Sequence, residues 1–135
     1  MSQKKKILYI EDDEANRELV GFILAQKNHL VMLEAETGQQ GLERAASERV
    51  DLIILDISLP DINGDEVLRR LKSNPETANI PVIALTGGPA PKLISESDQQ
   101  GFTDYLSKPV NLERLHQALE NALADRDSSL LRSGD

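Results

Sequence analysis

Short runs of apolar residues alternate along the chain with longer stretches in which apolar residues recur every three or four positions. The short runs predict buried strands, and the wider spacing predicts helices with one face on a core. The predicted strands are residues 5–11, 30–36, 51–57, 81–86 and 102–107. The predicted helices are residues 14–27, 37–49, 65–73, 92–100 and 111–125. This alternation predicts an α/β fold with a doubly wound, five-stranded parallel sheet and five helices.

The same spacing assigns faces and ends to the helices. Leu19, Phe22 and Ile23 share one face of the first helix, and Thr37 is the expected N-cap of the second. The remaining helices carry apolar positions in helical register at Leu42, Ala45, Ala46, Val67, Leu68, Leu71, Leu112, Leu115, Leu119, Ala122 and Leu123. We therefore predict one domain over residues 1–126 and a short disordered tail over residues 127–135.

Composition narrows the possible functions. The chain has 135 residues, no cysteine and a net charge of −8, which excludes disulfides and disfavours nucleic acid and anionic membrane surfaces as partners. Lys4, Lys5 and Lys6 precede an apolar run, but that run meets acids too soon for a signal peptide. No segment approaches the roughly 18 apolar residues of a membrane span. We expect a soluble cytoplasmic protein.

Chemically capable residues follow the predicted strands where each strand ends. Glu11 and Asp12 follow the first strand, Asp56 ends the third, Thr86 ends the fourth and Lys108 follows the fifth. Open α/β sheets bind ligands outside the carboxyl ends of their strands. The sequence therefore predicts three carboxylates, one hydroxyl and one ammonium group along a single edge of the sheet.

A charge count indicates what such an edge binds. Glu11, Asp12 and Asp56 contribute −3 and Lys108 contributes +1, so the acids repel one another unless a cation is present. Hard oxygen ligands suit Mg²⁺, which brings the site to neutrality and admits a phosphoryl group. Asp56 is the best candidate nucleophile because carboxylates form aspartyl phosphates. Lys108 and Thr86 are candidate donors to the phosphoryl oxygens.

Each of these residues also has an ordinary structural interpretation. Asp12 or Asp13 would cap the first helix, Thr86 would be a strand residue, and Lys108 would be a solvated surface charge. Asp51, at the amino end of the same strand as Asp56, is most simply a turn residue. The combination of these residues at one edge of the sheet supports a functional site more strongly than any one of them does alone.

Four segments resemble the receiver domain of two-component response regulators: ILYIEDDEANREL, LIILDISLPDINGDEVL, VIALTG and DYLSKPVN. They occur in the family's order and spacing and cover about residues 5–125. The resemblance implies a flavodoxin-like fold with strand order 2-1-3-4-5. It also implies that Asp56 is the phosphoacceptor, and that Glu11, Asp12, Asp56 and the backbone carbonyl of Ser58 hold Mg²⁺.

The resemblance also implies a conformational switch. Thr86 matches the hydroxyl that turns toward the phosphoryl group, and Tyr105 matches the aromatic residue that rotates inward with it. Lys108 matches the family's invariant lysine, and the bond to Pro109 is expected to be cis. The chain departs from the family at Gly87, where alanine is usual.

Two further positions lie where the family tunes dephosphorylation. Ser58 is one of them, and Gly88 is the other. Gly88 has no side chain to orient an attacking water.

The function expected from the resemblance is that of a signalling switch. It would take a phosphoryl group from a phosphohistidine of a sensor histidine kinase or histidine phosphotransfer protein. It would then present an altered surface on the fourth helix, fifth strand and fifth helix to a downstream protein. Its only reactions would be self-phosphorylation from phosphodonors and autodephosphorylation. The chain would be a stand-alone regulator or a receiver fragment of a hybrid histidine kinase.

Other classes fit the residues less well. A Mg²⁺-dependent aspartyl-phosphate phosphatase usually needs a second acid two residues after its nucleophile, where this chain has Ser58. A flavin carrier needs a phosphate-binding loop after the first strand, where residues 11–14 are acidic. A degenerate receiver that binds partners without phosphorylation would not need the complete set of residues at the sheet edge.

Overall fold

The computed structural model describes residues 4–87 and 101–133. Its five strands pair in parallel in the order β2-β1-β3-β4-β5, which confirms the predicted sheet. They are β1 (Lys5–Ile10), β2 (Leu30–Ala35), β3 (Leu52–Asp56), β4 (Val82–Thr86) and β5 (Asp104–Ser107). The helices of the described part are α1 (Glu14–Ala25), α2 (Gly38–Ser47), α3 (Gly64–Ser73) and α5 (Leu112–Ser133). The helix predicted at 92–100 lies outside the described residues.

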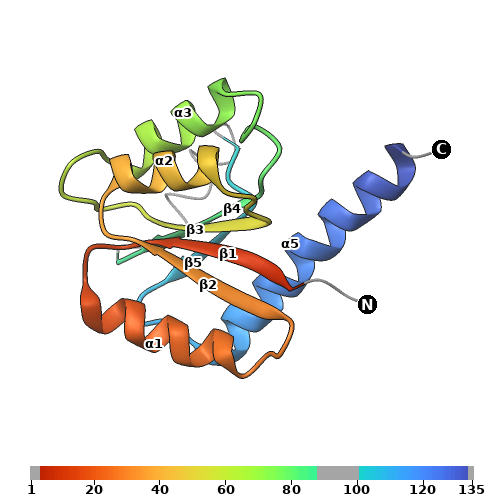
Figure 1. The fold of residues 1–135 in the computed structure, drawn as a ribbon. Helices are drawn as coiled ribbons and strands as arrows, with labels where there is room; N and C mark the ends of the chain where they lie inside the picture. The colour runs from red at the N-terminus through yellow and green to blue at the C-terminus, as the bar shows by residue number, and fades with distance from the viewer. Residues whose placement is uncertain (1–3, 88–100, 134–135) are drawn as a thin grey trace.

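Helices cover both faces of the sheet. α1 and α5 lie on one face, and α2 and α3 lie on the other (Figure 1). Side chains alternate between the faces along a strand, so Ile7 and Tyr9 of β1 join one core while Leu8 and Ile10 join the other. Every residue of β3 and β4 is buried, which explains why these strands appear in the sequence as unbroken apolar runs.

The strand register brings the carboxyl ends of the inner strands together. Ile10 pairs with Leu55 of β3, and Asp56 pairs with Leu85 of β4. Thr86 pairs in turn with Ser107 of β5. The residues at and just after these positions are the predicted site residues, so the sheet itself gathers them at one edge.

Polar side chains begin the helices that follow this edge. Asp13 caps α1 by accepting a hydrogen bond from the Ala15 amide, and Thr37 caps α2 by accepting one from the Gln40 amide. The cap predicted at Thr37 is confirmed, and of the two acids considered for α1 it is Asp13 that caps. Asp12 is thereby left available for other contacts.

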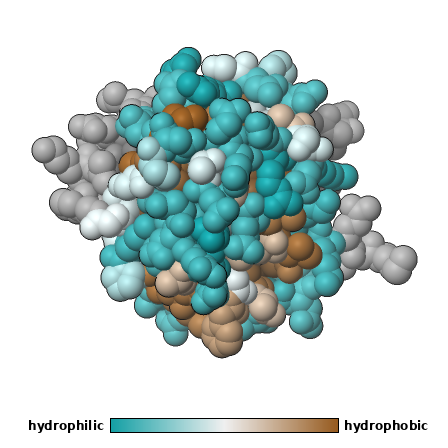
Figure 2. All heavy atoms as spheres, turned by 60° about the vertical axis from the view of Figure 1, so that its left-hand side comes forward, coloured by the Kyte–Doolittle hydropathy of each residue, from teal (hydrophilic) through white to brown (hydrophobic). Residues whose placement is uncertain are grey.

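The predicted inner face of α1 is wrong in part. Ile23 is buried, but Leu19 and Phe22 are 40% and 67% exposed. The buried stripe is Val20, Ile23 and Leu24, which has the i, i+3, i+4 spacing of a helix face. In Figure 2, hydrophobic atoms show in the lower part of a mainly hydrophilic surface, at the height where Figure 1 places α1.

Two positions in other helices also differ from their apolar pattern. Ala46 of α2 is exposed and Leu112 of α5 is 38% exposed, whereas Ala45 and Leu115 are buried. The buried residues of α2 are all small, namely Gly38, Gly41 and Ala45, and Gly41 lies directly against Ile10 of β1. Apolarity alone therefore overestimates the width of the buried stripe.

The last helix is longer than the sequence pattern predicts. We expected an end near residue 125 and a disordered tail, but α5 continues to Ser133 and extends beyond the sheet (Figure 1). No proline or glycine interrupts residues 112–133, so nothing in that stretch stops a helix. Within the part of the chain that the structure describes, no helix is both long and apolar enough to cross a membrane.

Candidate functional site

Three carboxylates meet at the carboxyl edge of the sheet. One oxygen from each of Glu11, Asp12 and Asp56 lies within 4.8 Å of the others. Glu11 and Asp56 are only 1% and 2% exposed, while Asp12 is exposed. Two nearly buried charges beside a third like charge are unfavourable without cationic partners. The geometry thus confirms that the predicted acids form one cluster.

Lys108 is the cation that lies among these acids. Its Nζ is 3.1 Å from Oε1 of Glu11 and 3.4 Å from Oδ2 of Asp56. Partial burial by itself lowers the pKa of Lys108, but the hydrogen bond to Glu11 and the charge of Asp56 outweigh it and raise the pKa above its usual value. Lys108 therefore stays charged and offsets part of the repulsion between the acids.

The backbone around Lys108 fixes where its side chain starts. The Lys108 amide donates to the Thr86 carbonyl at 2.7 Å, which extends the pairing between β4 and β5 by one bond. The Lys108–Pro109 peptide is cis, as the resemblance implied. Thr86 and Lys108 are thus joined by a direct main-chain contact beside the acids.

Glu11 is held by several donors. Its Oε1 accepts from the Tyr9 hydroxyl at 2.9 Å and from the Asn16 amide at 3.4 Å, in addition to Lys108. Its Oε2 accepts from the Asp13 backbone amide at 3.3 Å. The role of Tyr9 was not predicted from the sequence, although the alternation of β1, continued by one residue, would put Glu11 on the same side as Tyr9.

Arg17 of α1 is a second residue that the sequence reasoning missed. Its guanidinium is nearly buried and donates to the Glu11 carbonyl oxygen at 2.8 Å. It also contacts the carboxylates of Glu34 and Glu36, at 3.1 and 3.3 Å. Arg17 therefore ties the end of β1 to the end of β2. No simple sequence signal distinguishes it from a surface arginine.

The loop after β3 turns back on the end of the strand. The Ser58 amide donates to Oδ1 of Asp56 at 3.1 Å, and the Gly64 amide donates to the Ile57 carbonyl at 2.9 Å. A Cβ at Gly64 would lie 2.7 Å from the Ile57 Cα, so only glycine allows this close approach. The loop thereby fixes the orientation of the Asp56 carboxylate.

The two predicted switch residues lie on neighbouring strands, Thr86 on β4 and Tyr105 on β5. Thr86 and Tyr105 are both buried. The ring of Tyr105 packs edge-on against Phe102, with centroids 5.8 Å apart. A Cβ added at Gly87 would meet nothing within 4 Å, so space does not require glycine where the family usually has alanine. Gly88 lies outside the described residues.

Comparison with known proteins agrees with this geometry. Residues 7–120 match the family model described as "Response regulator receiver domain". The chain belongs to the response regulator receiver family. Receivers act as signalling switches of two-component phosphorelays and are generally not catalytic enzymes.

Relatives include both short and long proteins. The receiver is 34% identical over 122 residues to the polar-differentiation response regulator DivK of Brucella anthropi, covering 90% of this chain and 98% of that protein. It is 37% identical over 123 residues to a probable cyclic di-GMP phosphodiesterase of Vibrio cholerae, covering 85% of this chain. The chain spans only 26% of the length of that phosphodiesterase.

A solved structure of another receiver domain resembles this chain in fold. The receiver domain of the sensor histidine kinase PA1611 from Pseudomonas aeruginosa superposes with a TM-score of 0.81 at 26% identity, covering 90% of this chain and 98% of that chain. That structure is described as having a magnesium ion coordinated in the active site cleft. In this receiver, the oxygen donors of Glu11, Asp12 and Asp56 form the set that Mg²⁺ prefers, and the exposed Asp12 gives a hydrated ion access.

Asp51 lies at the other end of β3 and corrects our expectation of a simple turn residue. It is buried, and its Oδ2 accepts a hydrogen bond from the Lys6 amide at 2.8 Å. The Asp51 amide donates in return to the Lys6 carbonyl at 2.9 Å. Its carboxylate therefore continues the β1–β3 pairing beyond the last backbone bond.

Proposed function

We propose that this receiver takes a phosphoryl group from a phosphohistidine onto Asp56 and passes the signal to a downstream protein. The observation that carries the proposal is the position of Asp56. It ends the central strand, lies among two other acids and has the Lys108 ammonium 3.4 Å from its Oδ2. An acid that served only structure would not need two acidic neighbours, which raise its energy in the folded state.

The transfer is a substitution at phosphorus. A carboxylate oxygen of Asp56 attacks the phosphorus atom and forms a P–O bond, while the P–N bond to the donor imidazole breaks and its electron pair stays on the nitrogen. Mg²⁺, when bound, supplies charge that offsets the acids and the incoming phosphoryl oxygens. Glu11, Asp12, Asp56 and the Ser58 carbonyl would hold it. Lys108 would donate to the phosphoryl oxygens.

The response would begin at Thr86 and Tyr105. A phosphoryl group on Asp56 offers the Thr86 hydroxyl a new acceptor. Movement of Thr86 would change the space beside Tyr105 and so the surface formed by β5 and α5. The partners proposed are a sensor histidine kinase or histidine phosphotransfer protein upstream, in the cytoplasm, and an effector protein downstream.

Mass spectrometry tests the proposal directly. Incubation with acetyl phosphate and Mg²⁺ should add one phosphoryl group to the intact protein, and Asp56→Asn should prevent it. Asp61→Asn is a matched control in the same loop, because Asp61 accepts from the Gly38 and Gln39 amides at 2.8 and 3.0 Å and not from the site. A phosphoryl group mapped to Asp13 or Asp61 in the wild type would disprove the assignment of Asp56.

A further inference from the structure

The donors to Glu11 differ in how firmly they are held. Lys108 reaches Oε1 from the open edge of the sheet, with 25% of its side chain exposed. Asn16 reaches the same oxygen from α1 at the longer distance of 3.4 Å. Tyr9 reaches it from inside the protein, at 2.9 Å, with none of its surface exposed. Among the side chains that contact Oε1 of Glu11, Tyr9 therefore has the least freedom to move.

The core fixes the Tyr9 ring. It belongs to the cluster between the sheet and helices α1 and α5, which includes Ile23, Leu115 and Leu119. The Tyr9 hydroxyl donates to Oε1 of Glu11 at 2.9 Å from a ring that the core holds in place.

We propose that Tyr9 is a positioning residue of the metal site, whose hydroxyl anchors Oε1 of Glu11 and so fixes how the carboxylate faces the cation. The inference rests on the proposed function, since it concerns the site that would hold Mg²⁺. Residues behind metal ligands commonly fix ligand orientation in this way, and their loss weakens metal binding about 10- to 100-fold. Tyr9 is suited to this role because the core fixes its ring. If the Glu11 carboxylate rotated, it would lose the hydrogen bond to the Tyr9 hydroxyl.

Tyr9 gains importance once the site is phosphorylated. Lys108 bridges Glu11 and Asp56 in the structure. When Lys108 turns to the phosphoryl group on Asp56, its contact with Glu11 weakens. The Tyr9 hydroxyl does not leave, because the core holds the ring, so Glu11 keeps its orientation through the reaction cycle.

Calorimetric titration of the full chain with MgCl₂ tests the inference. Tyr9→Phe keeps the ring that fills the core and removes only the hydroxyl, and we expect Mg²⁺ to bind about 10-fold more weakly. Asn16→Ala removes the longer hydrogen bond and should weaken binding less. Ile23→Val alters the same core cluster without touching Glu11, and its Mg²⁺ affinity should equal that of the wild type.

Melting curves provide a second readout. Saturating Mg²⁺ should raise the melting temperature of Tyr9→Phe less than that of the wild type at the same metal concentration, because the stabilisation from a ligand grows with the logarithm of its concentration divided by its dissociation constant. Equal affinities in wild type and Tyr9→Phe would overturn the inference and leave the metal site standing. An equal loss in Tyr9→Phe and Ile23→Val would also overturn it, by assigning the effect to core packing. Wild-type protein that does not bind Mg²⁺ would overturn the proposed site itself.

Discussion

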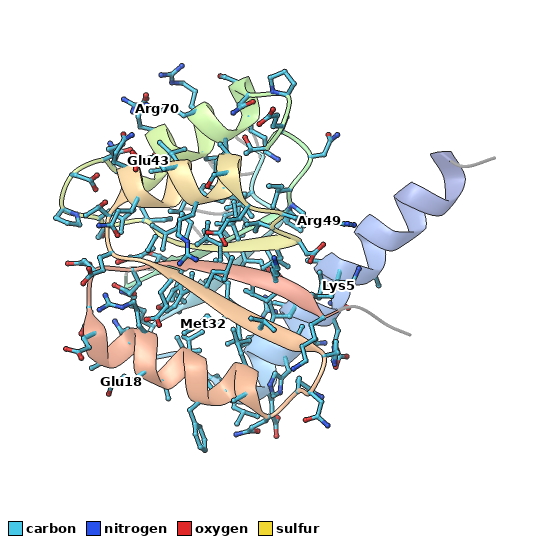
Figure 3. The ribbon with its side chains drawn as sticks, viewed as in Figure 1. Lys5, Glu18, Met32, Glu43, Arg49 and Arg70 are labelled. Atoms are coloured by element: carbon cyan, nitrogen blue, oxygen red, sulfur yellow. The ribbon has the colours of Figure 1, made fainter. Side chains whose placement is uncertain are left out.

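The two ends of β3 place the same side chain in opposite surroundings. Asp51, at the amino end, lies in a hollow lined by Lys4, Lys5, Lys6 and Arg49, and its carboxylate accepts from a backbone amide. Figure 3 shows Lys5 and Arg49 on this side of the molecule. Asp56, at the carboxyl end, lies among two more acids and one lysine. Asp51 therefore has positively charged neighbours that offset its own charge. Asp56 has more negative than positive charge around it.

This difference separates a structural acid from a functional one. Asp51 lowers the energy of the folded protein by completing the pairing of β1 and β3. Asp56 and its neighbours raise that energy, and such a cost persists in proteins where function requires it. Substitutions at the two ends should therefore change stability in opposite directions and change chemistry at one end only.

The largest expected effect concerns Asp12. Asp12→Asn removes the exposed acid of the cluster, and the acetyl phosphate reaction should slow by at least about 100-fold, because charged metal ligands contribute strongly to binding. Asp51→Asn should react at the wild-type rate. Intact mass measured over time gives both rates. Undiminished phosphorylation of wild type in excess EDTA would contradict the role of the cation.

The next effect concerns stability at the amino end. Asp51→Ala leaves the Lys6 amide without its acceptor, and we expect a loss of about 1–3 kcal/mol in the free energy of unfolding. Urea denaturation provides the measurement. Asp51→Asn keeps an acceptor oxygen, so its free energy of unfolding should fall by less than that of Asp51→Ala. A loss in Asp51→Ala no larger than in a surface substitution would show that this hydrogen bond is unimportant.

The opposite sign is expected at the carboxyl end. Asp56→Asn removes one like charge and keeps the shape of the side chain, so its stability in EDTA should exceed that of wild type by about 1 kcal/mol. Mg²⁺ should stabilise the wild type more than this variant. Melting curves with EDTA and with Mg²⁺ test both statements. A lower melting temperature for Asp56→Asn in EDTA would mean that its hydrogen bonds outweigh the repulsion.

The smallest effect depends on pH. The pKa of Lys108 is raised in the folded protein, so its contribution is complete below its unfolded pKa of about 10.4 and is lost as the pH rises through the folded pKa. The stability gap between wild type and Lys108→Met should therefore narrow above about pH 10, by less than about 1 kcal/mol, because water screens a partly exposed ion pair. Urea denaturation of both proteins at pH 8 and at pH 11 gives the difference in their free energies of unfolding at each pH. An unchanged gap would show that Lys108 is not coupled to the acids.

The sequence was sufficient for the parts of the fold that depend on local pattern. Unbroken apolar runs gave the strands, and Thr37 marked a helix start. The sheet order came through the resemblance and not from periodicity. The inner face of α1 could not be assigned from apolarity, since Leu19 and Phe22 fit a helical stripe as well as Val20 does. Which stripe packs on the sheet depends on the angle at which the chain leaves β1.

The candidate site was predictable where it depends on strand ends. Glu11, Asp12, Asp56 and Lys108 converge because parallel strands finish at the same edge. The supporting residues were not predicted, because the roles of Tyr9 and Arg17 depend on how far a long side chain reaches within the folded protein. The role of Asp51 was not predicted for the same reason, since its carboxylate accepts a hydrogen bond from the Lys6 amide, which is distant in sequence.

The length of α5 has a mechanical consequence. The helix begins at Leu112, shortly after the Lys108–Pro109 bond, and its far half extends beyond the sheet. At about 1.5 Å per residue, residues 124–133 extend roughly 15 Å further. A stiff rod held at one end converts a small tilt into a larger displacement at the other. Any tilt of the base of α5 would therefore displace its far end by more than its base.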